Sequence, residues 1–252
     1  MQLTEVQGLD HLPEPIRRYL EFSHVLGKRP IVSASFKTVG HMRRGMNPKW
    51  LQMSGQESMT TSPPGFIWRG RVSMFPGLWV SGTDSSIEGR GKMVIKLMSL
   101  VRIGEEEGDE ADQAELMRFL SEVTLIPTFW LSPTLRWETV DDSTAGVALN
   151  FGATTTKATV RINENDEMSS LSGQRFMSVG HGRHELRPWT GRMKEYREVN
   201  GFRVPTAFEV AWNLEGGDFT YFKGRVENLR YAFEQQTMSR FDEKNAAMGE
   251  DA

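Results

Sequence analysis

The stretch "PPGFIWRGRVSMF", residues 63 to 75, decides the fold, because large apolar residues alternate in it with arginine, glycine and serine. In an extended strand, successive side chains point to opposite faces of the sheet. The predicted strand carries on one face Phe66, Trp68, Gly70, Val72 and Met74, and on the other Ile67, Arg69, Arg71 and Ser73. We expect the apolar face to point inward. Arg69 and Arg71 are expected on a solvated outer face, with cross-strand partners such as Glu57.

The same alternation continues on both sides of this stretch. Candidate strands fall between residues 32 and 102, between 135 and 178, and between 191 and 233, separated by Gly, Pro and Asn turns. Asn200-Gly201 is the strongest hairpin signal, because both residues tolerate positive φ. Accumulated twist curls a sheet of this size. The sequence therefore predicts a mainly β (β-rich α+β) fold, a large curled antiparallel sheet or half-open barrel of about ten strands.

Two helices are expected beside the sheet. A short N-terminal helix is predicted within residues 12–27, with Pro15 in its first turn and Gly27 at its end. A second helix interrupts the strands: Asp109 is its expected cap, and its apolar stripe stops at Pro127. The acidic run 105–107 before it is interpreted as a solvated turn.

Bulk composition excludes several classes of function. The 252 residues carry a net charge of -3, which gives no electrostatic footprint for nucleic acid, and contain no cysteine for disulfides or thiolate metal sites. The N-terminus does not have the pattern of a signal peptide, so we expect the protein in the cytoplasm. If an export signal had been trimmed from the chain, we would expect it in the cell envelope. No transmembrane segment is predicted. We expect one β-rich domain over residues 1–235 and a polar, mobile tail over 236–252.

The order of motifs resembles an uncharacterised bacterial family, a domain of unknown function. The resemblance covers nearly the whole chain and rests on "LPEPIRRYL", "PPGFIWRGRVSM", "EGRGKMVIKLMSLV", "AELMRFLSEVTLIPT", "LRWETVDD" and "GRMKEYREVNGFRVPTAFEVAWNLEGGDFTYFKGRV". It implies no catalytic residues. More distantly, the topology is similar to the lipoprotein-carrier (LolA/LppX-like) half-barrel fold, whose concave face is covered by helices and receives acyl chains. Such carriers act in the cell envelope and need an export signal, which this sequence lacks.

An inward apolar row on a curled sheet is typical of a ligand-lined cavity or of an ordinary core. For the first interpretation, the expected ligand-binding residues are Phe66, Trp68, Met74, Trp79, Met93 and Trp212. Fourteen methionines add adaptable apolar surface. The leading hypothesis is non-enzymatic binding of an apolar or amphipathic small molecule, a lipid or fatty acid, without cofactor or metal. If Phe119, Leu120, Phe129 and Trp130 of the inserted segment fill the concavity, no room remains for a ligand.

Two further functions stay open from the sequence alone. An enzyme would need polar residues that converge at the barrel mouth, for which the candidates are His181, His184, Glu195 and Glu209. The motif "HGRH" lacks the helical spacing and the glutamate of a zinc protease site, so no metal is predicted there. The other alternative is a structural or partner-binding module, which a solid interior and an outer apolar patch would favour. The oligomeric state is not predicted.

Overall fold

A computed structural model of the chain describes residues 9–43, 46–180 and 182–233. His181 and the predicted tail 236–252 lie outside the described residues. The elements are α1 (Glu14–Phe22), β1 (Ile31–Met42), β2 (Leu51–Thr61), β3 (Pro64–Phe75), β4 (Leu78–Ile87), β5 (Arg90–Leu97), β6 (Val101–Glu107), α2 (Asp109–Glu122), η1 (Val123–Leu125), η2 (Pro127–Leu131), β7 (Leu135–Asp141), β8 (Thr144–Phe151), β9 (Thr154–Ile162), β10 (Met168–Gly180), β11 (Arg183–Val199), β12 (Phe202–Leu214) and β13 (Gly217–Phe233).

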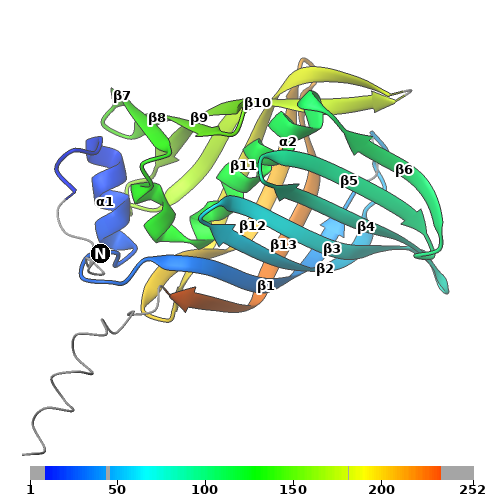
Figure 1. Ribbon diagram of the computed structural model, residues 1–252, viewed down its shortest axis with the longest axis horizontal. Helices are drawn as coiled ribbons and strands as arrows, with labels where there is room; N and C mark the ends of the chain where they lie inside the picture. The colour runs from blue at the N-terminus through cyan, green and yellow to red at the C-terminus, as the bar shows by residue number, and fades with distance from the viewer. Residues whose placement is uncertain (1–8, 44–45, 181, 234–252) are drawn as a thin grey trace, which may run out of the picture.

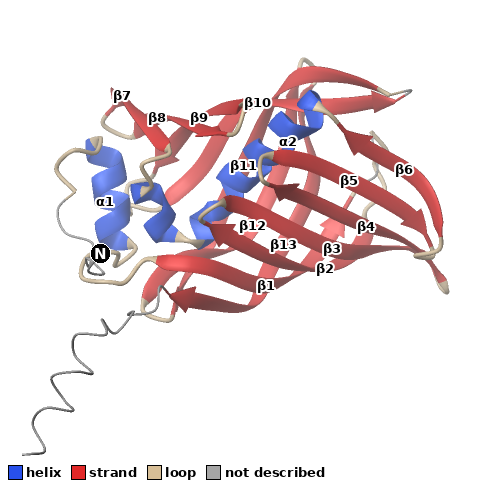
Figure 2. Ribbon diagram, in the orientation of Figure 1, coloured by secondary structure: helices blue, strands red, loops and turns tan. Residues whose placement is uncertain are grey.

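All the described strands belong to one antiparallel sheet that curls around α2 (Figure 1, Figure 2). Its order is β6-β5-β4-β3-β2-β1-β13-β12-β11-β10-β9-β8-β7, so β1 and β13 join the two halves of a meander. The curled antiparallel half-barrel predicted from the sequence is confirmed, with 13 strands rather than about ten. The hairpin predicted at Asn200-Gly201 is confirmed as well, and both residues have positive φ.

Two local predictions before α2 were wrong. The span 91–102 is not one strand, because a turn at Met98 and Ser99, whose φ angles are 51° and 64°, separates β5 from β6. The acidic run 105–107 is not a turn but part of β6, where Glu105 forms an ion pair with Lys92 across the hairpin. Cross-strand lysines provide the charge partners that make an acidic strand stable.

Helix α2 lies along the concave face and bridges the two halves of the sheet. It contacts β4 and β5 on one side and β9 and β10 on the other. Gly91 and Gly173 permit this close approach, because a Cβ on either would clash with α2, with the Ala111 carbonyl or with the Met117 side chain. The helix cap differs from the prediction: Gly108 holds the N-cap position, and Asp109 is the first helical residue. None of the described helices is long and apolar enough to cross a membrane.

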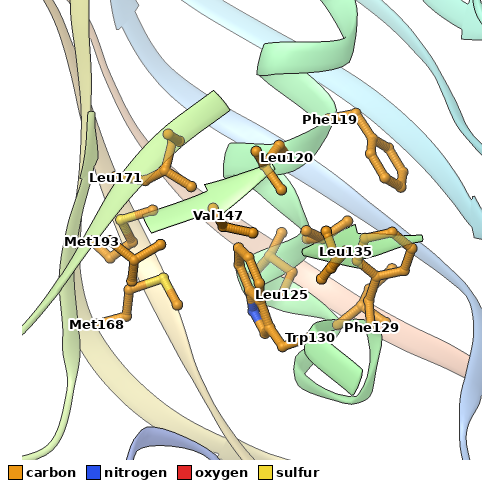
Figure 3. Close-up of a cluster of buried hydrophobic side chains, with 14 of the residues drawn as sticks. Phe119, Leu120, Leu125, Phe129, Trp130, Leu135, Val147, Met168, Leu171 and Met193 are labelled. Atoms are coloured by element: carbon orange, nitrogen blue, oxygen red, sulfur yellow. The ribbon is translucent and has the colours of Figure 1, made fainter. Parts of the chain in front are cut away.

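The hydrophobic core fills one side of the concave space. Figure 3 shows Phe119 and Leu120 of α2 and Phe129 and Trp130 of η2 among side chains of the β7–β11 half, including Val147. Trp130 and Leu120 are fully buried there. Helix α1 packs against β8 and β9 beside this core. The inserted segment therefore fills the concave space in front of strands β7–β11. Strands β1–β5 face the other side of α2.

Candidate functional site

A cavity of about 380 Å³ lies on the concave side between α2 and the strands β1–β5 and β11–β13. Its wall is mostly apolar and includes Met42, Met53, Val72, Met74, Val80, Met93, Ile95, Met193, Val210 and Phe222. Helix α2 and η1 present Arg118, Ser121, Glu122 and Leu125 to it, whereas Phe119 and Leu120 point into the core. The concavity is therefore divided by α2 into a packed half and a hollow half.

The space exists partly because three glycines make room for an indole. Gly55, Gly70 and Gly82 lie side by side on β2, β3 and β4. A Cβ at Gly55 or Gly70 would overlap the Trp68 ring, and one at Gly82 would lie 3.1 Å from it. The Trp68 indole thus lies flat over a glycine row, so it forms the cavity wall without filling the cavity.

The residues predicted to bind a ligand fall into two groups. Trp68, Met74 and Met93 contribute to the cavity wall. Phe66 is buried in the core, with the Arg118 guanidinium carbon 4.6 Å from its ring centroid. Trp212 stacks on Tyr221, which itself lines the cavity, at 5.8 Å between centroids. Trp79 pairs with Ser73 and lies with Arg71 in a shallow outer groove, so Val80 is the inward residue there.

A cluster of buried charges forms one end of the cavity wall. We call it the charge cluster; its members are Glu57, Asp84, Glu115, Arg118, Glu122 and Arg175. Arg118 donates to Glu57 and Glu122, both at 3.1 Å, and also to Asp84. Arg175 donates to Glu115 at 3.2 Å, and Glu115 is the one member that does not line the cavity. The expectation that Glu57 faces outward was wrong: its side chain is 1% exposed and points to α2.

The charge cluster has more carboxyls than guanidinium groups. Glu57, Asp84, Glu115 and Glu122 each keep one buried oxygen that has no hydrogen-bond donor within the described part of the chain. The carboxyls lie in two pairs within hydrogen-bonding reach, Glu57 with Glu122 and Glu115 with Asp84. A proton on Glu57 and another on Glu115 would supply a donor within each pair. Burial, followed by the neighbouring carboxylate, raises the pKa of Glu57 and of Glu115 well above the ordinary range, which favours this protonation.

Arg43 lies at the other end of the cavity, where β1 ends. Its guanidinium carbon lies 4.2 Å from the Trp50 ring centroid and 5.2 Å from that of Phe219. Its buried Nε finds no hydrogen-bond partner among the described residues. A guanidinium held between two aromatic rings keeps its planar donor edge available for an anion.

Of the polar residues considered for an enzyme, Glu195 and Glu209 lie in the same outer groove, and His184 lies apart from them. Glu195 pairs with Arg225, and Glu209 pairs with Lys194 and Lys223, along the outer groove. His184 lies 3.5 Å from Glu106 of β6 instead. Within the described ranges, no group of three His, Asp or Glu residues is arranged to hold a metal ion.

Sequence reasoning missed the charge cluster and Arg43. Glu57 gives a usable signal, because it shares the inward phase of β2 with Met53, Gly55 and Met59. Arg118 gives another, since it stands between two buried residues of α2, Met117 and Phe119. A charge in an inward phase predicts a buried partner.

A family model supports the expected resemblance to a domain of unknown function. A sequence model described as "Family of unknown function (DUF6544)" matches residues 1–224. None of the curated proteins matches the chain. The crystal structure of a LolA superfamily protein from Nitrosomonas europaea is similar over 88% of this chain and 93% of its own, with 10% sequence identity and a TM-score of 0.42.

Proposed function

We propose that this chain, which belongs to the Family of unknown function (DUF6544), binds one apolar or amphipathic small molecule, a lipid or fatty acid, in its concave cavity. The observation that carries the proposal is the hollow between α2 and the β1–β5 half, lined by apolar side chains. Burying an acyl chain there removes its apolar surface from water, at about 0.8 kcal/mol per CH₂ group. The binding requires no chemical step.

The size of the cavity limits the ligand. At about 380 Å³ it is near the lower end of the ~300–1,000 Å³ that small-molecule sites usually span. We therefore expect a ligand with a single alkyl chain rather than a lipid with several. Five methionines in the wall, Met42, Met53, Met74, Met93 and Met193, can change rotamer around chains of different shape.

The two ends of the cavity favour a defined orientation. The four carboxyls of the charge cluster outnumber its two guanidinium groups, so it offers no excess positive charge to an ionised head group, whereas Arg43 has a buried Nε without a partner among the described residues. An anionic head group therefore favours the Arg43 end, with the alkyl chain directed toward Trp68. The proposed ligand is a fatty acid or a similar single-chain anion.

Titration with a dansyl-labelled fatty acid tests the proposal. Wild-type protein should bind it saturably, with one site per chain, and unlabelled oleate should compete. Val80→Trp places an indole in the cavity and should weaken binding at least tenfold. Ile87→Trp is the matched control, because Ile87 is in the same strand but exposed at the β4–β5 turn. Equal binding by both variants would place the probe outside the cavity and refute the proposal.

A further inference from the structure

Large apolar side chains are exposed at one edge of the sheet, by which we mean the end of the strands where alternate turns lie. In an antiparallel meander, alternate turns fall at the same edge, so the β1–β2, β3–β4 and β5–β6 turns lie together. The β5–β6 turn projects at the right of Figure 1. We call the exposed side chains the apolar fringe; they are Met46 (55% exposed), Phe75 (62%), Met98 (38%), Leu100 (81%) and Val101 (61%).

Contacts link the neighbouring turns that carry the fringe. The Lys49 ammonium lies 5.2 Å from the Phe75 ring centroid, which joins the first turn to the second. The Met98 amide donates to the Trp79 carbonyl at 2.9 Å, and the Trp79 indole donates to Ser99 Oγ at 3.2 Å, which join the third turn to β4. Exposed apolar side chains gathered at one site usually mark an interaction surface.

The charge around the fringe is positive. The described residues of the three turns include the basic side chains of Arg43, Lys49 and Arg102 and no acidic one, and Arg102 pairs with Glu105 of β6. Arg71 and Lys96, on the adjoining strands, add two further exposed basic side chains. This positive edge contrasts with the net charge of -3 for the whole chain.

The cavity reaches this same edge. Met42, Leu51, Met74 and Val80 line it, and each lies within a few residues of one of the three turns. Glu57 and Asp84 of the charge cluster line it farther along β2 and β4. A molecule that leaves the cavity at the strand ends therefore emerges between the apolar fringe and the basic side chains.

We propose that this edge docks the protein onto the surface of an anionic lipid bilayer. The fringe inserts among the lipid head groups, and the basic side chains contact phosphates, as amphipathic membrane-binding surfaces do. A fluid bilayer can accommodate apolar side chains on separate turns, because lipid molecules rearrange around each of them. No complementary groove is needed. The docking goes beyond ligand binding in the cavity and does not depend on it.

Co-sedimentation of the full chain with vesicles tests the docking. Wild type should sediment with vesicles of phosphatidylcholine and phosphatidylglycerol, and added salt should weaken this, because surface charge attraction is screened. Leu100→Ser with Val101→Ser should lower the partition coefficient about tenfold or more, given the apolar area removed. Ile87→Ser, which removes a 51% exposed side chain from a turn at the opposite edge, should bind like wild type.

The outcomes separate docking from cavity binding. Val80→Trp should still sediment with vesicles although its cavity is filled. The proposal is overturned if wild type does not bind anionic vesicles, or if Ile87→Ser loses as much as the fringe variant. Sedimentation velocity without lipid gives the other overturning result: self-association that the fringe variant removes, without vesicle binding, would assign the fringe to contact between two copies of the chain.

Discussion

Removal of the Arg118 guanidinium tests whether the charge cluster holds α2 against the sheet. In Arg118→Met, a side chain of similar length occupies the site, but Glu57, Asp84 and Glu122 lose their shared donor. Breaking a buried ion pair by removal of one partner typically costs about 3–5 kcal/mol. For a chain of this size that corresponds to a fall in melting temperature of roughly 6–20 °C.

The stability that Arg118→Met loses should be larger at higher pH. The pKa of Glu57 and of Glu115 is raised in the folded state, so their contribution to stability is fully present below the unfolded value of 4.5 and is lost as pH rises through the folded pKa. Without the guanidinium, a charge within the cluster becomes still less favourable. Arg118→Met should therefore lose more stability at about pH 8 than at about pH 5.5.

Denaturation followed by circular dichroism at both pH values measures the free energy of unfolding of the wild type and of Arg118→Met. Arg102→Met is the control: Arg102 is exposed at the surface, so its ion pair with Glu105 should contribute little to stability. Adding Glu57→Gln to Arg118→Met should restore part of the loss at the higher pH, because one buried charge is removed. The reasoning is refuted if Arg118→Met is as stable as Arg102→Met at the higher pH, or if Glu57→Gln deepens its loss there.

Three further predictions concern the cavity and its ends. Gly70→Ala should push the Trp68 indole into the cavity, which should lower the free energy of unfolding by about 1–3 kcal/mol through overpacking and weaken fatty-acid binding. Gly104→Ala, whose Cβ would lie 3.6 Å from Ile95, should change neither stability nor binding. Denaturation measures the first quantity and fatty-acid titration the second. Arg43→Met should weaken oleate binding about tenfold and leave methyl oleate binding unchanged in calorimetry, since one charged hydrogen bond is lost; equal losses would contradict the proposed orientation. Glu57→Gln alone should flatten the decline of stability with rising pH in denaturant titrations, and an unchanged slope would mean that Glu57 does not hold the proton.

The strands could be predicted from the sequence because their residue pattern is local. The alternation over residues 66–74 fixes which face is apolar, and Asn200-Gly201 marks a hairpin that the backbone φ angles bear out. The β5–β6 turn was missed because Met98 and Ser99 reach positive φ without a glycine or an asparagine. There the hairpin imposes a conformation that the residues themselves do not favour.

The site could be predicted only in part, because it depends on pairings between distant residues. Arg118 lies 61 residues from Glu57 and 34 from Asp84, so no spacing rule relates them. Trp79 was placed inward by simple alternation, but a register shift between Ser73 and Phe75 sets it opposite Ser73 on the outer face. A bulge of this kind leaves no clear mark in one sequence.

Native mass spectrometry of protein purified from cells tests ligand binding in the cavity most directly. Wild-type protein should carry one additional mass that solvent extraction identifies as a single-chain lipid, and Val80→Trp purified in the same way should lack it. Wild-type protein without added mass, which also takes up no oleate when the two are mixed, would contradict the account.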